Sequence, residues 1–353
     1  MKLLEQICDL WLKQVDLCKK RKWDQFDRTA QKAWGFLGKT YSELYLARGE
    51  ENDEFPHIKG PFYKTRLNKS REFVSLMLPY IYQRVPNRLV SPRRPELPQE
   101  LLQELMMQGV QVAPTTTFEE RMRAYLMQWW LNYLPGEYNL NREARTAIQE
   151  ALVKGRGVVW HEMVEGPYGE IPASYYDSVD NLLIDADCVQ MRDAGFIIRR
   201  RQRQVYRVAE EYGIDPEKLR GQATSALQQA LSAIHEPAYT TNDESKKGDI
   251  CVYYEVWSRM GVGHRLVGAS EEMKEVSDAL DAIGPYVHLV IAPGVPHPLN
   301  LPPDLIEGGV ISQEEIIKRL EWPIAFFDDA ASNPWPCTVL DFYPNCDNPW
   351  ASS

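Results

Sequence analysis

The strongest guide to the fold is a change in hydrophobic period near Gly155. Before this residue, apolar side chains recur three and four positions apart, which is the spacing of one helical face. From Gly157 the chain reads Gly-Val-Val-Trp-His-Glu-Met-Val, a pattern typical of a strand. The sequence therefore predicts an α+β protein with a helical N-terminal region and a strand-rich central region. The helices expected in the first part cover 1–40, 65–84 with Pro79 near its end, 118–134 stopped by Pro135-Gly136, and 141–154 capped by Asn141.

The second part is expected to form a small sheet with helices between its strands. Gly166-Pro-Tyr-Gly169 predicts a turn after the first strand, and Gly213 predicts a helix end. Residues 237–249 predict a loop, and 328–353 shows no periodicity. The expected strands are 157–164, 171–176, 179–184, 196–199, a hairpin of 250–259 with 264–267, 286–292 and 323–327. The expected helices are 204–212, 215–237, 271–283 and 312–320.

Two stretches divide the chain. Residues 48–60 form an acidic run with Gly and Pro, and residues 91–98 hold three prolines, which exclude a helix or a central strand. We therefore expect a linker or extended arm at 91–98. The predicted parts are 1–60 (helical N-terminal segment), 61–156 (helical region), 157–345 (α+β core) and 346–353 (coil).

Charge and composition exclude several classes of function. The 353 residues include 40 Lys and Arg against 50 Asp and Glu, a net charge of −10, so the chain lacks the basic footprint of a high-affinity duplex-DNA binder. No apolar run is long enough to span a membrane, and nothing near the N-terminus resembles an export signal. The six cysteines form no Cys-x-x-Cys pair, which argues against a disulfide framework or a zinc ribbon. We expect a protein of the cytoplasm without a membrane partner.

The segment Ala33-Trp-Gly-Phe-Leu-Gly-Lys-Thr40 matches a relaxed phosphate-binding loop. In such a loop, Lys39 would contact the β- and γ-phosphates and Thr40 would contact Mg²⁺. The context argues against it, because an amphipathic helix precedes the motif instead of a buried strand. The favoured interpretation is a helix C-terminus capped by Gly35 or Gly38.

Other motifs are weak. Gly155-Arg-Gly157 lacks the third glycine of a dinucleotide site, and His161-Glu162 lacks the second His of a zinc-protease helix. Asp185 and Asp187 are too few for a calcium site and indicate a turn. We therefore expect no catalytic residue, no cofactor and no metal.

The strongest basic cluster is a run of arginines after the strand at 196–199. Arginine suits bidentate contacts with anions, so the run is a candidate for contact with DNA phosphates or with an acidic neighbouring subunit. The alternative is a solvated strand-to-helix transition paired with Glu210 and Glu211. The candidate residues are Arg199, Arg200, Arg201 and Arg203.

The order of the motifs resembles the central region of tailed-bacteriophage portal proteins. The order is a helix, a Gly-x-Gly strand, an Asp-ended strand, an arginine strand and a helix, and the resemblance covers roughly 65–345. The stretches that carry it are 151–162, 171–185, 194–200, 208–215, 252–257 and 322–327.

The resemblance implies a non-enzymatic ring, commonly of twelve subunits, at one capsid vertex. Double-stranded DNA passes through the channel of such a ring during packaging and ejection, and a separate terminase hydrolyses ATP. The implied partners are further copies of the chain, DNA in transit, terminase, the major capsid protein and neck or tail adaptor proteins. The implied location is the virion, after assembly in the host cytoplasm. In these terms 61–156 is the wing-like region and 157–345 the portal core, with stem and clip borders unassigned.

Two alternatives remain open. One is an ATPase that uses Lys39 and Thr40, and the other is a different virion adaptor without a DNA channel.

Overall fold

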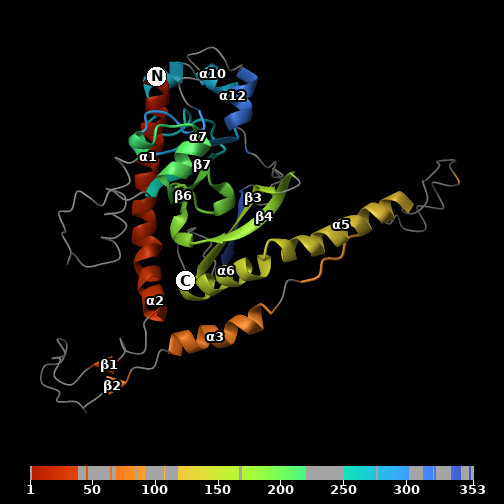
Figure 1. Cartoon of the computed structure of the whole chain (residues 1–353). Coiled ribbons are helices and arrows are strands. Elements are labelled where there is room, and N and C mark those ends of the chain that lie inside the picture. Colours follow the sequence, from red (N-terminus) through yellow and green to blue (C-terminus); the bar gives the residue numbers. More distant parts are fainter. Residues whose placement is uncertain are drawn as a thin grey trace, which may run out of the picture.

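In the computed structural model, a mixed α/β body has a long helix along one side, and two helices extend from it elsewhere (Figure 1). The predicted combination of a helical N-terminus and a strand-rich centre is confirmed at this level. The described residues are 2–38, 45–46, 64–65, 69–83, 86–91, 107, 118–166, 169–219, 250–275, 277–301, 313–320, 322, 335–342 and 350.

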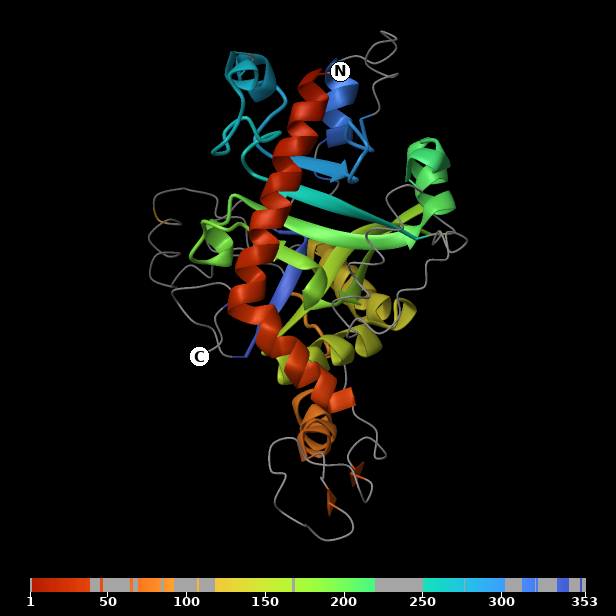
Figure 2. The same cartoon turned by 90° about the vertical axis from the view of Figure 1, so that its left-hand side faces the viewer.

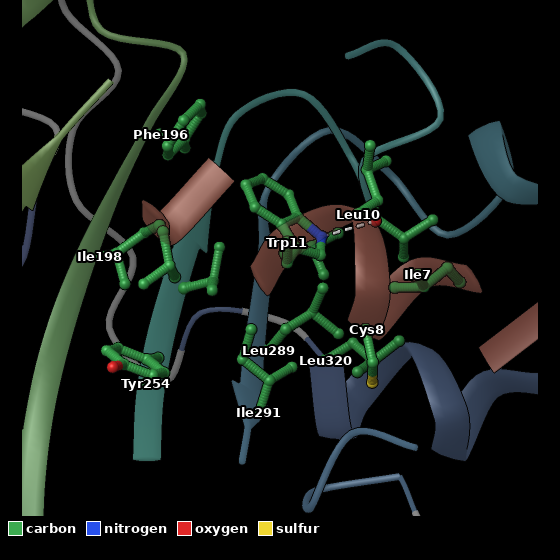
Figure 3. Packing of buried hydrophobic residues seen from close by; sticks show 14 of the residues in the cluster. Ile7, Cys8, Leu10, Trp11, Phe196, Ile198, Tyr254, Leu289, Ile291 and Leu320 are labelled. Atoms are coloured by element: carbon green, nitrogen blue, oxygen red, sulfur yellow. Dashed lines mark hydrogen bonds between the residues drawn. The ribbon is translucent and has the colours of Figure 1, made fainter. Parts of the chain in front are cut away.

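The N-terminal helix is continuous as predicted. Its apolar stripe packs against a sheet, where the Trp11 side chain is fully buried (Figure 3). The indole Nε1 of Trp11 donates to the carbonyl of Val262 at 2.8 Å, and its ring meets Phe196 edge-on with centroids 5.1 Å apart. Burial of one face therefore anchors the helix along the sheet. The helix consists of α1 (Lys2–Lys22), the π-turn η1 (Trp23–Asp27) and α2 (Arg28–Gly38).

The sheet under α1 has four antiparallel strands in the order β5-β6-β7-β8. Every residue of β7 after Ile250 is buried, because α1 covers one face of this strand and the second sheet or the α7 region covers the other. This explains why β7 reads as a continuous apolar run instead of an alternating one. The elements are β5 (Leu182–Ile184), β6 (Phe196–Gln204), β7 (Ile250–Ser258) and β8 (Val287–Ile291), with η3 (Val179–Asn181), η4 (Met191–Asp193) and α7 (Val205–Tyr212).

A second antiparallel sheet, in the order β4-β3-β9, lies against α6. Gly157 permits the close approach of β3 to α6, because a Cβ on this residue would lie 2.1 Å from the backbone oxygen of Ala147. Gly155 ends α6 with a φ of 88°, as predicted. The elements are α6 (Leu140–Lys154), β3 (Arg156–Gly166), β4 (Gly169–Asp177) and β9 (Cys337–Asp341).

Helix α5 projects from the body on the side away from α1, and α3 lies beyond the C-terminal end of α2, in contact with α2 and α6 (Figures 1 and 2). Residues 86–91 run beside α5, where the side chain of Asn132 accepts from the amide of Arg88 at 2.8 Å and donates to its carbonyl at 3.0 Å. These contacts fix an extended segment to one face of α5. The helices are α3 (Lys69–Ile81) and α5 (Phe118–Glu137), and the remaining elements are β1 (Tyr45–Leu46), β2 (Lys64–Thr65), α9 (Glu271–Glu275), α10 (Ser277–Asp281) and α12 (Gln313–Leu320).

The predicted hairpin of 250–259 with 264–267 is wrong. Residues 259–268 form turns, in which Gly261, Gly263 and Gly268 adopt positive φ values of 65°, 109° and 98°. Such angles are incompatible with a strand, and β7 pairs instead with β8. The two short helices at 271–281 lie between them, within the predicted helical segment.

No strand was predicted in the aperiodic segment 328–353, but Cys337–Asp341 form β9, which pairs with β3. Trp350 is fully buried, with its ring 5.5 Å from that of Phe26 and 4.9 Å from the Nζ of Lys22. The tail therefore completes the second sheet and its core.

Smaller boundary differences remain. Helix α6 begins before Asn141, which lies within it, and the cap position is Asn139 in a left-handed conformation without a side-chain hydrogen bond. Helix α5 runs through Pro135-Gly136 to Glu137. Predictions for 48–60, 92–98, 220–249, 323–327 and most of 346–353 fall outside the described residues.

Within the described stretches, no helix combines the length and the apolar character needed to cross a membrane.

Candidate functional site

The candidate arginines lie on β6, an inner strand of the four-stranded sheet. Successive side chains on a strand point to opposite faces, so Arg199, Arg201 and Arg203 share one face and Arg200 lies on the other. The shared face meets β3 and β4 of the second sheet, and the strand partner β7 places Glu255 directly opposite Arg199. The strand geometry thus brings alternate arginines to an interface inside the molecule.

Arg199 is almost fully buried, with 3% of its surface exposed. Its Nε donates to the Oδ2 of Asp177 at 2.8 Å, and its Nη1 donates to the hydroxyl oxygen of Tyr175 at 2.9 Å and also bonds Glu162. The guanidinium carbon lies 4.4 Å from the centroid of the Trp160 ring. Arg199 therefore joins β6 to both β3 and β4 through paired charges and an aromatic face.

Arg201 repeats this arrangement two residues later. Its Nη2 donates to the hydroxyl oxygen of Tyr175 at 2.7 Å and bonds Glu162, while its Nε lies 3.1 Å from the Oε1 of Glu255. One tyrosine and one glutamate are thus shared between two arginines. We call Arg199, Arg201, Glu162, Asp177 and Glu255 the charge cluster.

Burial and charge shift the pKa values of the cluster in opposite directions. For Glu162, burial favours the neutral acid, but Arg201 and Arg199 outweigh it and hold the pKa below the usual range. For Glu255, burial outweighs the same two cations and raises the pKa to about 7. Burial also raises the pKa of the Tyr175 hydroxyl. The cluster thus contains one firmly ionised carboxylate and one that titrates near neutral pH.

Arg203 and Arg200 differ from the buried pair. Arg203 is partly exposed and pairs with Glu211 at 2.7 Å, as the strand-to-helix alternative predicted for this residue. Arg200 is partly exposed on the opposite face of β6. Above the cluster lies an open hollow of ≈ 520 Å³ lined mainly by polar and charged residues from β3, β4 and β6.

This geometry limits what the four candidates can contact. Arg199 and Arg201 are committed to carboxylates of the same chain, so their charge is largely neutralised before any phosphate approaches. Arg200 and Arg203 remain the members of the run whose side chains reach solvent. Contact between the arginine run and DNA or a neighbouring subunit stays a prediction, and Arg200 and Arg203 are its first candidates.

The other sequence motifs form parts of a helix or a turn. Residues 33–38 of the phosphate-loop match continue α2, preceded by helix instead of a strand, while Lys39 and Thr40 lie outside the described residues. Asp185 caps a turn by accepting from the amides of Asp187 and Gly195, which confirms the predicted turn. Among the described residues, no group of three potential ligands is placed to hold a metal ion.

Sequence reasoning did not identify the carboxylate partners of the arginines. Glu162, Asp177 and Glu255 come from three other strands, so no spacing along the chain connects them to the run. An available signal was the presence of Glu162 and Glu255 inside the apolar strands β3 and β7, since a charge there needs a partner.

No protein-family model and no curated protein matches this chain.

Proposed function

We propose that this chain is a portal subunit, which assembles with further copies into a ring at a capsid vertex and lets double-stranded DNA pass through its channel. In this role it has no catalytic residue of its own. Terminase, the major capsid protein and neck or tail adaptor proteins would dock on the ring, and the site of action would be the virion.

The observation that carries the proposal is the apolar surface of α5. Tyr125 and Trp129 expose 63% and 57% of their surfaces, and a helix with such side chains needs a protein partner. The other large apolar side chains exposed on this helix are Phe118, Met122, Leu126, Met127, Trp130 and Tyr133. This single chain therefore presents an unfinished interface, as a ring subunit does.

The order of elements supports the same proposal. Helix α6, the Gly-x-Gly strand β3, the arginine strand β6 and helix α7 follow one another in the order on which the resemblance rests. The expected Asp-ended strand is a short strand, β5, followed by the turn at Asp185.

The distribution of charge suits a conduit. Many phosphate contacts would bind DNA tightly and make each step of movement costly. The chain carries a net charge of −10, and its buried arginines are already paired with carboxylates. A net negative charge of this size would weaken the hold on a polyanion and let it slide.

The ATPase alternative lacks structural support, because Ala33–Gly38 is helical where the phosphate-binding motif needs a loop after a strand. Replacing Lys39 by Ala should leave nucleotide binding unchanged at its background level. Loss of a measurable ATP affinity in this variant would favour the ATPase instead.

Electron microscopy of the purified protein tests the proposal. We expect closed rings with an axial hole wide enough for duplex DNA. A closed oligomer without a hole would favour a virion adaptor, and a lone compact particle under all assembly conditions would contradict the proposal.

A further inference from the structure

Strand β6 has an open edge along its second half. β5 pairs only with residues 197–199 of this strand, whereas β7 pairs with it as far as Gln204. Among the described residues, 200–204 therefore have a strand neighbour on one side and none on the other. Gln202 and Gln204 are exposed, which agrees with an open edge.

The strand register shows which backbone groups point toward this edge. On the β5 side of β6, the amide of Asp185 donates to the carbonyl of Phe196 at 3.3 Å. In an antiparallel ladder, alternate residues direct their N–H and C=O groups to the same side. The register with β7 is continuous, so the backbone groups of Arg200 and Gln202 point to the side that β5 has left. Among the described residues, none forms a hydrogen bond with these groups on that side.

The open hollow of ≈ 520 Å³ above the charge cluster lies along this edge. Its lining includes the five successive residues 199–203 of β6, with Asn181 and parts of β3 and β4. Successive side chains point to opposite faces, so a lining of this kind indicates that the edge of the strand borders the hollow. An added strand would lie about 4.8 Å from β6, along this hollow.

Charge decides which kind of strand fits. The charge cluster neutralises Arg199 and Arg201, so the available cations are Arg200 and Arg203. Arg200 forms no ion pair with any residue that the structure describes, and Arg203 has a surface pair with Glu211, which is worth little. The two arginines lie on opposite faces of β6, so an added strand would meet a cation on each of its faces.

An acidic strand satisfies this edge better than other occupants. The same edge of a second copy would place arginine beside arginine, which is unfavourable. DNA phosphates would pair with the arginines, but they offer no donor to the carbonyls of Arg200 and Gln202. An extended acidic peptide satisfies both the arginines and the backbone groups. We propose that residues 200–204 bind an extended acidic segment of a partner protein, which adds a strand beside β6 in line with β5. This inference does not depend on the proposed ring.

A labelled peptide, Val-Glu-Glu-Val-Glu-Glu-Val, tests the inference, because it carries glutamates on both faces when it is extended. Fluorescence anisotropy measures its affinity for the full chain, and a peptide with lysine at each glutamate position is the control. In the protein, Gln202→Pro removes the N–H that points to the open side and leaves the ladder with β7 intact. Gln202→Ala keeps this N–H and is the matched control. Circular dichroism checks that each variant is folded.

We expect saturable binding of the glutamate peptide and no binding of the lysine peptide. Gln202→Pro should weaken the binding at least about tenfold, because it removes a backbone hydrogen bond and its ring occupies the place of the added strand. Gln202→Ala should bind within about twofold of the parent chain. Arg200→Glu should weaken the binding about tenfold. In the parent chain, the peptide should also slow hydrogen exchange of the amides of Arg200 and Gln202, a reading that needs no variant.

Three results would overturn the inference. If the glutamate peptide does not bind, the arginines serve to keep the open edge from pairing with other strands. If Gln202→Pro binds as well as Gln202→Ala, or if exchange of the two amides is unchanged, the peptide is held by charge without strand pairing. If short duplex DNA displaces the peptide at a lower concentration than unlabelled peptide does, the arginines belong to a nucleic-acid site. Closed rings of the parent chain would leave the proposed function standing in each of these cases.

Discussion

Replacing Glu255 by glutamine tests whether the charge cluster makes stability depend on pH. Glu255 is buried on β7, with its Oε1 3.1 Å from the Nε of Arg201 and its Oε2 3.8 Å from the Nη1 of Arg199. Burial raises its pKa from 4.5 to about 7 in the folded protein. Glutamine keeps the shape of the side chain and removes the titration.

The expected effect follows from the difference between folded and unfolded states. Below pH 4.5 both states bind the Glu255 proton, so ionisation costs nothing. Between pH 4.5 and about 7 the folded state holds more protons, and the free energy of unfolding falls as the pH rises. Above pH 7 the full cost applies, about 3 kcal/mol at about 1.4 kcal/mol per pH unit. The parent chain should therefore lose about 3 kcal/mol relative to Glu255→Gln between pH 4.5 and 8.

Urea unfolding followed by circular dichroism at several pH values measures this difference. Chain concentration must be equal in all samples, since assembly adds to apparent stability. The other titrating groups are common to both proteins and largely cancel in the comparison. A difference that stays constant with pH, or one in which the parent chain gains stability as the pH rises, would refute the reasoning.

Three further substitutions test the packing, each by urea unfolding at neutral pH. Gly157→Ala should lower the free energy of unfolding by about 1–3 kcal/mol, because the new Cβ would lie 2.1 Å from the oxygen of Ala147. The matched control Gly136→Ala, with nothing within 4 Å of the new atom, should be neutral or stabilise by up to about 1 kcal/mol. Trp350→Ala should cost about 3–5 kcal/mol, and a loss below 1 kcal/mol would contradict its place in the core. Arg199→Leu should cost about 3–5 kcal/mol because it removes the buried cation that pairs with Asp177 and leaves Glu162 and Glu255 with Arg201 alone, and unchanged stability would show that the cluster is not formed.

Local patterns were sufficient to predict most of the helices. The stripe that includes Trp11 and Val15 gave the face of α1 that the sheet covers, and the glycines at 155 and 213 gave the ends of α6 and α7. In these cases the deciding interactions lie within one or two helical turns, so they are visible as spacing in the sequence.

Strand pairing was harder to predict because the partner is distant. β9 has no alternating pattern of its own and becomes a strand through pairing with β3. The partner of β7 is β8, although a nearer segment, 264–267, was predicted to pair with it. Residues around this segment form turns with three glycines at positive φ, and such backbone angles cannot be read from the hydrophobic pattern.

The candidate site shows the same limit. The arginine run lies on β6, where the period of two places Arg200 on the other face from Arg199 and Arg201. The neutralising carboxylates arrive from β3, β4 and β7, so the sequence overstated the positive charge of the site. Positive residues in a row are therefore a weak guide to phosphate binding when the strand is central in a sheet.

The solution mass of the parent chain tests the central claim most directly. The account predicts one closed species that stays unchanged on dilution, near 490 kDa, which is about twelve times the 40.8 kDa of one chain. A mass of 40.8 kDa at every concentration, or a series of masses that grows without limit, would contradict the account.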